Sequence, residues 1–473
     1  MTDLTYKPAL ELSDMIGAKQ ISAVELMRAT LDRIGATNGA VNAIVSLRDG
    51  DALLAEAKAA DGAESKGWLH GIPIAIKDLG NVRGLPTSMG SPLFAGQIAE
   101  KDDIIVARLR NAGAIVIGKT NTPEFGLGSH TFNPVFGATQ NPYDRTRTCG
   151  GSSGGAAVAL ACGMMSVADG SDMMGSLRNP AAWNNVYGMR PSEGLVPSEP
   201  KVGGDTYLQH LSTNGPMARN PRDLAALLDT MAGADTRQPF ALTLPMSLPA
   251  IDADVSGRKI GWLGDWNGAF AFEAGILEVC QSALEQMTGL GVNVEDVGAP
   301  HARENIWDAW VTLRHFSMAC SWGPQFQDEN TRDRLKKTAQ WEIEDGLLLS
   351  AQDVHKASAL RSGWFADAAK LFERFDVLAL PSAQVWPFPV ETEYPTEISG
   401  KTMDTYHRWM EVMIPASLIG LPVVTVPIGF GENGLPMGLQ LIGPRGSDAR
   451  LLQLAQVWHK ATDWPANARP SLA

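Results

Sequence analysis

Short apolar runs alternate with helical patterns along most of the chain, and this alternation predicts an α/β layer architecture. Six runs have the length and apolar content of buried strands, namely residues 71–77, 114–118, 259–263, 377–380, 423–428 and 438–442. Ser22 and Glu25 have the spacing of a helix capping box, and further helical patterns cover residues 51–61 and 305–371. Residues 156–165 are small and apolar, which fits either a helix or a strand.

Two segments are rich in turn-forming residues. Residues 141–155 are polar and glycine-rich and predict a loop, while the proline-rich residues 381–395 predict a long surface loop. We find no fixed-period repeat and no linker in the sequence. Nothing in the pattern therefore marks a domain boundary.

Composition excludes several classes of protein. Apolar residues make up 44% of the chain and charged residues only 19%, so neither a disordered chain nor a coiled coil is expected. The net charge of −13, without any run of Lys or Arg, argues against nucleic-acid binding. The four cysteines lie far apart, and neither an export signal nor a membrane span is visible. We expect a cytoplasmic protein without a zinc site or a disulfide framework.

Lys77 ends the first apolar run, in the sequence GIPIAIK. A lysine in this position either extends along the apolar surface to reach water or stays partly buried. Loss of hydration would lower the pKa of a buried lysine, so that its neutral amine could act as a base. The run alone leaves both interpretations open.

Ser152 and Ser153 stand between two pairs of glycines in the segment 149–155. Glycines allow the backbone to turn sharply and a substrate to approach closely, but they are also typical of a flexible loop. The Gly-Lys-Ser/Thr ending of a phosphate-binding loop is absent.

Ser176 follows Gly175 within the segment 169–180. Consecutive backbone N–H groups there would form an anion-binding nest of the kind that acyl transfer requires. The alternative is an ordinary helix start, with Ser176 as the N-cap and Pro180 in the first turn.

Together, these three features resemble the amidase signature family, with Ser176 placed 24 positions after Ser152. Further segments similar to that family are residues 118–125, 136–144, 415–422 and 434–440. The resemblance covers about residues 10–240 and 375–460 and extends to stand-alone bacterial members such as aryl acylamidases, 6-aminohexanoate-cyclic-dimer hydrolases and urethanases.

The resemblance implies an α/β fold in which residues 1–473 form one domain, a single α/β/α sandwich around a large mixed sheet. Residues 70–200 would be the signature core, and residues 245–370 a variable helical region that contributes to substrate cover. The resemblance implies no cofactor and no metal. The binding partner that it implies is a small-molecule amide or carbamate substrate, and not nucleic acid or a membrane. A homodimer is compatible with the resemblance.

The resemblance also implies a Ser–cis-Ser–Lys triad. Ser176 matches the nucleophile, Ser152 the bridging serine after a cis Gly151–Ser152 peptide, and Lys77 the base, which must start neutral. The family's oxyanion donors correspond to the backbone N–H groups of Met173, Met174, Gly175 and Ser176. Its supporting positions correspond to Ser153, Asp172 and Arg178.

The sequence departs from the family pattern at positions that bear on the substrate. Met174 stands where the family has glycine, so Met173 or Met174 either shapes the acyl pocket or fills the core. Further departures are Cys149, Asn184 and Asn185. Residues 205–212 and 381–409 are candidate specificity loops. The aromatic residues that either line a hydrophobic pocket or pack in the core are Trp183, Trp386, Phe388, Tyr406 and Trp409.

The expected reaction is hydrolysis of the C–N bond of an amide, anilide or carbamate (urethane), with an ester as a further option, through an acyl-enzyme intermediate. Two other assignments stay open. An amidase subunit of an aminoacyl-tRNA amidotransferase would carry the same triad. A Ser-His-Asp α/β-hydrolase is the other, because residues 150–155 fit Gly-x-Ser-x-Gly and His407 or His459 could be the histidine of the triad. That fold places the serine directly after a buried apolar strand, whereas the residues before this motif are polar.

Overall fold

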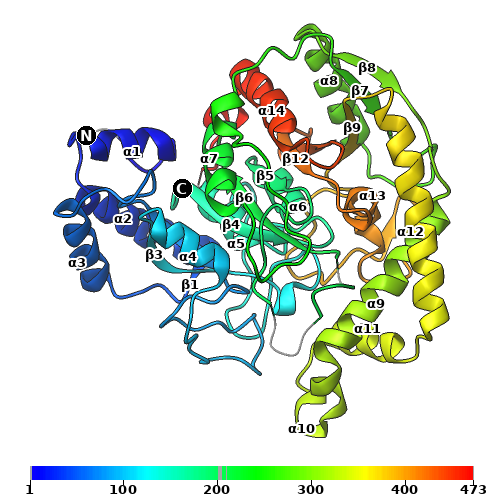
Figure 1. The fold of residues 1–473 in the computed structure, drawn as a ribbon, viewed down its shortest axis with the longest axis horizontal. Helices are drawn as coiled ribbons and strands as arrows, with labels where there is room; N and C mark the ends of the chain where they lie inside the picture. Colours follow the sequence, from blue (N-terminus) through cyan, green and yellow to red (C-terminus); the bar gives the residue numbers. More distant parts are fainter. Residues whose placement is uncertain (1–2, 201–204, 209, 472–473) are drawn as a thin grey trace.

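Two β-sheets organise the computed structural model, which describes residues 3–200, 205–208 and 210–471 (Figure 1). The larger sheet has the strand order β4 (Val167–Asp172), β6 (Thr213–Ala218), β5 (Tyr187–Arg190), β12 (Val423–Phe430), β13 (Pro436–Ile442), β9 (Val377–Pro381), β7 (Lys259–Trp262) and β8 (Asn293–Asp296). The smaller sheet has the order β1 (Ile44–Val45), β3 (Ile115–Thr120) and β2 (Pro73–Lys77). A separate hairpin joins β10 (Glu397–Ile398) to β11 (Lys401–Thr402).

The larger sheet is mixed. Strand β7 pairs in parallel with β8 and β9, whereas the pairings from β4 across to β9 are antiparallel. All residues of β9 and β13 are buried, and since successive side chains point to opposite faces, both faces of the sheet centre are covered. The α/β architecture around a large mixed sheet is therefore confirmed.

Helices supply the cover. They are α1 (Ala9–Gly17), α2 (Ala23–Val41), α3 (Gly50–Asp61), α4 (Ile104–Asn111), α5 (Gly154–Ala161), α6 (Arg178–Trp183), α7 (Pro221–Met231), α8 (Ile276–Gly289), α9 (Arg303–Gln327), α10 (Glu329–Arg332), α11 (Lys337–Leu347), α12 (Ala351–Phe372), α13 (Ile414–Leu418), α14 (Asp448–Thr462) and α15 (Trp464–Asn467). Helix α9 packs against α11 and α12 on the side of the molecule opposite α1 to α3 (Figure 1).

Several sequence-based predictions are confirmed at the level of single elements. The capping box of α2 is present, with the Glu25 N–H donating to Ser22 Oγ at 3.1 Å and the Ser22 N–H donating to Glu25 Oε2 at 2.7 Å. The six predicted strands correspond to β2, β3, β7, β9, β12 and β13. The ambiguous segment 156–165 begins as helix α5.

A side chain joins the two sheets where β2 lies beside β4. The backbone N–H of Lys77 donates to Asp169 Oδ1 at 2.9 Å, in place of a bond from one strand backbone to the next. The last residue of β2 is thereby fixed against the third residue of β4. This junction carries the candidate site.

Within the larger sheet, the sequence pattern missed four strands, namely β4, β5, β6 and β8, and it also missed the two-residue strands β1, β10 and β11. Strand β4 has the sequence VADGSD, which lacks the apolar run of a central strand, yet five of its six residues are buried. Its polar groups are satisfied by partners that are distant in sequence, such as the N–H of Lys77.

The prediction of a surface loop over residues 381–395 was wrong for its first half, because residues 381–388 are buried. Their polar groups have partners inside the protein: the Gln384 side chain donates to Ala271 O at 2.9 Å and accepts from Val412 N at 3.0 Å. Among the described residues, no helix combines the length and apolar character needed to cross a bilayer.

Candidate active site

Lys77 lies at the centre of a cluster of serine hydroxyls. Its side-chain nitrogen Nζ donates to Ser152 Oγ at 2.8 Å, to Ser153 Oγ at 2.9 Å and to Ser171 Oγ at 3.1 Å. The residue is only 2% exposed, so its side chain does not extend to water. Three elements that are far apart in the chain, β2, the glycine-rich loop and β4, therefore meet at one amine.

Burial sets the protonation of this amine. Loss of hydration lowers the pKa of Lys77 to about 7, although the negative charges of Asp169 and Asp172 act in the opposite direction. At pH 7 a substantial fraction of Lys77 is consequently neutral, and its nitrogen can accept a proton.

The glycines of the segment 149–155 bring the backbone very close to its neighbours. A Cβ atom on Gly154 would lie 2.2 Å from Thr131 Oγ1, and one on Gly155 would lie 2.3 Å from Asn121 N. The Gly151–Ser152 peptide is cis, and helix α5 begins directly afterwards at Gly154. The segment is thus a tightly packed turn and not a flexible loop.

Ser176 lies on the turn between β4 and α6. Leu177 is the N-cap of α6, so Ser176 does not cap that helix and the N-cap interpretation was wrong. Gly175 has a φ of 90°, and a Cβ there would lie 2.6 Å from Met413 Cγ. The Ser153 N–H donates to Ser176 O at 3.2 Å, which links this turn to the glycine-rich loop.

Backbone N–H groups near Ser176 fall into two sets. Those of Gly175 and Leu177 donate to the two carboxylate oxygens of Asp172, at 2.8 and 3.1 Å. Those of Met173, Met174 and Ser176 make no hydrogen bond within the described part of the chain. The second set is available to an external acceptor.

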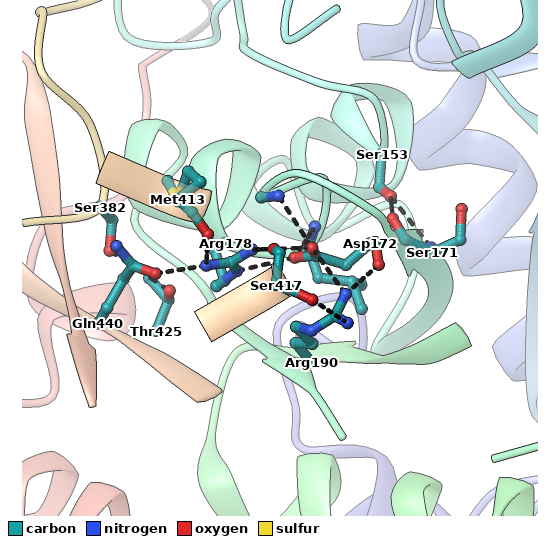
Figure 2. A network of polar contacts seen from close by, with 12 residues as sticks. Ser153, Ser171, Asp172, Arg178, Arg190, Ser382, Met413, Ser417, Thr425 and Gln440 are labelled. Carbon is teal, nitrogen blue, oxygen red and sulfur yellow. Dashed lines mark hydrogen bonds and ion pairs between the residues drawn. The ribbon is translucent and has the colours of Figure 1, made fainter. Parts of the chain in front are cut away.

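Asp172 is the anchor of this turn (Figure 2). Arg178 binds both of its carboxylate oxygens, each at 2.9 Å, and Arg190 approaches Oδ1 at 3.3 Å. Arg178 also reaches Met413 O and Ser417 Oγ, at 3.0 and 2.6 Å, and so ties the turn to the C-terminal part of the chain. Burial disfavours the charged carboxyl, but the two guanidinium groups outweigh it and hold the pKa of Asp172 well below its usual range.

A cavity of about 220 Å³ opens beside these residues. Both Ser152 and Ser176 line it, and helix α9 contributes a wall that includes Arg314 and Trp322. Its other apolar wall residues are Leu79, Met89, Phe125, Leu127, Met173, Met174, Met318 and Met410, and its further polar ones are Ser129, Ser171, Ser212, Ser317 and Ser321. Helix α9 lies within residues 245–370, the region that the family resemblance implied would contribute to substrate cover, but no pattern in the sequence indicated which of its side chains line the cavity.

The aromatic residues considered as pocket lining lie elsewhere. Trp183 stacks on Trp409 with ring centroids 5.9 Å apart, and Phe388 meets both rings edge-on. Trp386 and Tyr406 are buried and do not line this cavity. Of the two candidate specificity loops, residues 205–212 reach the cavity through Ser212, while Gln209 lies outside the described residues.

The departures at Cys149 and Asn184 are coupled. Asn184 Nδ2 donates to Cys149 O at 2.8 Å and to Pro180 O at 2.7 Å, so it links the glycine-rich loop to α6. Asn185 instead binds the C-terminal segment through Trp464 O at 2.8 Å. Both asparagines therefore hold neighbouring backbone segments together through hydrogen bonds to carbonyl groups.

Neither histidine of the Ser-His-Asp alternative lies at the serines. His407 is fully buried beside the rings of Trp307 and Tyr406, and His459 contacts the Tyr187 hydroxyl at 3.2 Å. The side chain that meets Ser152 and Ser153 is Lys77.

Comparison with known proteins agrees with this geometry. The family model described as Amidase matches residues 25–452. A glutamyl-tRNA(Gln) amidotransferase subunit from Acidothermus cellulolyticus is 33% identical, over 96% of this chain and 94% of its own. An acylamidase of Rhodococcus erythropolis is 31% identical, over 99% and 98%. The crystal structure of a bacterial aryl acylamidase superposes with a TM-score of 0.90 at 28% identity, covering 98% of this chain and 99% of that one. The chain belongs to the amidase signature family of hydrolases.

Proposed function

We propose that this protein is a stand-alone amidohydrolase that uses Ser176 as nucleophile, Ser152 as proton relay and Lys77 as base. The observation that carries the proposal is the 2.8 Å contact between Lys77 Nζ and Ser152 Oγ, next to a cavity that Ser152 and Ser176 both line. A serine hydroxyl is a weak nucleophile at its ordinary pKa and needs an adjacent base. A lysine with a pKa of about 7 meets that need.

In the first half of the reaction, Ser176 Oγ attacks the carbonyl carbon of the substrate and transfers its proton to Ser152, which passes its own proton to Lys77. The oxygen of the tetrahedral intermediate accepts from the free N–H groups of Met173, Met174 and Ser176. Gly175 is left out of this set, because its N–H is already bound to Asp172. The proton then returns along the same route to the leaving nitrogen, and water releases the acyl group from Ser176.

The cavity wall supports an uncharged, largely apolar substrate. Methionine, phenylalanine, leucine and tryptophan side chains form the largest group of its wall, serine hydroxyls are the next largest, and no Asp or Glu lines it among the described residues. Anilides, extended aliphatic amides and carbamates match such a wall, with esters passing through the same acyl-enzyme.

A second candidate is the amidase subunit of an aminoacyl-tRNA amidotransferase, favoured by the 33% identity to the Acidothermus protein of that name. That role would require an ammonia-donating amide to bind in this cavity. A free amino acid amide carries an ammonium group, and burying a charge without a partner is unfavourable. The absence of a carboxylate from the described wall is the reason to prefer the first candidate.

The experiment is to purify the single chain and assay a panel of anilides, linear aliphatic amides and dicarbamates, with glutamine as a further substrate. We expect turnover of uncharged substrates, loss of that turnover in Ser176→Ala, and labelling of Ser176 by a fluorophosphonate probe. Ser129→Ala is the matched control, because Ser129 lines the same cavity without contacting Lys77. Hydrolysis of glutamine alone would favour the second candidate, and a label on Ser153 would overturn the assignment of the nucleophile.

A further inference from the structure

Arg314 is the only charged side chain on the cavity wall among the described residues. It comes from helix α9 and is only 4% exposed. A buried guanidinium is costly unless its hydrogen bonds are made. Its partners therefore show what it can still bind.

Two of its three nitrogens have strong acceptors. Nε donates to Glu342 Oε1 at 2.6 Å, and Nη2 donates to the Tyr406 hydroxyl at 2.6 Å. That hydroxyl in turn donates to Glu342 Oε1 at 2.6 Å. The closed triangle fixes the plane of the guanidinium, and the carboxylate of Glu342 balances its charge.

The third nitrogen, Nη1, has one hydrogen-bond partner among the described residues, the thioether sulfur of Met173 at 3.4 Å. A thioether is a weak acceptor, so the N–H groups of Nη1 keep most of their hydrogen-bonding capacity. Met173 also lines the cavity, and it belongs to the turn that carries Ser176. A residue of the cavity wall thus carries an unused donor of fixed orientation, which lies against the side chain of Met173, a residue whose backbone N–H is a candidate oxyanion donor.

We infer that Arg314 is a specificity-determining residue that selects substrates with a second, neutral oxygen acceptor. This inference rests on the proposed function and deepens it. The substrate class is an apolar amide, anilide or carbamate that carries another carbonyl oxygen, as a dicarbamate or a linear diamide does. The acceptor is neutral because Glu342 already supplies the counter-charge, so a carboxylate would add an uncompensated negative charge to a buried site.

The test uses matched pairs of substrates with and without the additional carbonyl. One pair differs on the acyl side, the para-nitroanilides of hexanoic acid and of its keto analogue. The other differs on the leaving side, the acetanilides of para-ethylaniline and para-acetylaniline. Comparing each pair between wild type and variant cancels differences in intrinsic reactivity.

The main variant combines Arg314→Met with Glu342→Gln, which avoids leaving a buried carboxylate unpaired. Arg314→Lys is the second variant, because it keeps the charge next to Glu342 but lacks Nη1. In both variants we expect kcat/KM for the carbonyl-bearing member of at least one pair to fall about 10- to 100-fold more than for its plain partner, as for loss of a hydrogen bond to a charged group.

An equal fall for both members of both pairs would overturn the inference, since Arg314 would then only support the fold. If the wild type turns over a carboxylate analogue faster than the keto analogue, the inference that the acceptor is neutral is wrong. Calorimetric binding of the same pairs to Ser176→Ala, with and without Arg314→Lys, gives the preference without turnover. Failure of the proposed function therefore remains distinguishable from failure of this inference.

Discussion

Lys77 Nζ lies 2.8 Å from Ser152 Oγ, and the Lys77 side chain is buried. The contact joins the end of strand β2 to a serine 75 positions later in the chain. The burial that creates the contact also lowers the pKa of the lysine to about 7. Burial of Lys77 thus accounts both for the position of the proposed base and for its lowered pKa.

The pH dependence of activity should report Lys77. As the pH falls through about 7, the amine becomes protonated and can no longer accept a proton from Ser152, so kcat/KM should fall on the acid side. Lys77→Arg should be inactive across the range, because a guanidinium does not deprotonate. The exposed Lys101→Arg is the control and should match wild type. Activity in Lys77→Arg with an unchanged pH profile would rule out the proposed base.

In Asp169→Asn, the fall of kcat/KM on the acid side should occur at lower pH than in the wild type. Burial raises the pKa of the Asp169 carboxyl to about 6, so it is mostly ionised at neutral pH, and its charge raises the pKa of Lys77. Asparagine keeps the oxygen that accepts the Lys77 N–H but removes the charge. We expect a downward shift of about one pH unit, measured from kcat/KM against pH.

The control for that shift is Asp103→Asn. Asp103 lines the same cavity of about 60 Å³ behind Lys77, but its carboxylate accepts from Asn81 N at 2.9 Å instead. Asp103→Asn should therefore shift the acid-side fall of kcat/KM by less than Asp169→Asn does. Equal shifts in both variants would mean that the general charge of the cavity, and not Asp169, tunes the lysine.

Asp172→Asn should destabilise the protein at neutral pH by about 3–5 kcal/mol, because it leaves the buried Arg178 and Arg190 without their counter-charge. The folded-state pKa of Asp172 lies below its unfolded value, so its stabilisation is present above about pH 4 and is lost as the pH falls further. Urea unfolding at several pH values measures both effects. The exposed Asp32→Asn should change the free energy of unfolding by less than about 0.5 kcal/mol. A constant difference between wild type and Asp172→Asn down to the lowest pH would contradict this account.

Met174→Gly should change the ranking of substrates. Met174 is 3% exposed and lies both in the core and on the cavity wall, so its removal widens the space beside the proposed oxyanion donors. Branched acyl anilides should gain about 10- to 200-fold in kcat/KM relative to linear ones. Met287→Ala, a buried methionine that does not line this cavity, should cost about 2–5 kcal/mol of stability without changing the ranking. If Met174→Gly alters every substrate by one common factor, its side chain is core filler.

Local patterns in the sequence predicted the elements whose stability is mainly local or uniformly apolar. The α2 capping box needs only Ser22 and Glu25, and strands such as β12 are apolar along most of their length. Strands β4, β5 and β6 were missed because their polar and glycine-rich residues lack such a pattern. Their polar groups are satisfied by groups that only the fold brings near, as Asp169 is by the Lys77 N–H.

The sequence by itself determined which residues to examine for chemistry, because Lys77, Ser152 and Ser176 lie in motifs with fixed spacing and family resemblance. Only the tertiary structure decided what surrounds them. It placed the tryptophans around Trp183 in the core and brought Arg314 to the cavity wall, where Glu342 and Tyr406 hold it. The physical reason is that a motif specifies a local backbone turn, whereas a cavity wall is made of side chains from distant helices, whose orientation depends on packing that no local pattern encodes.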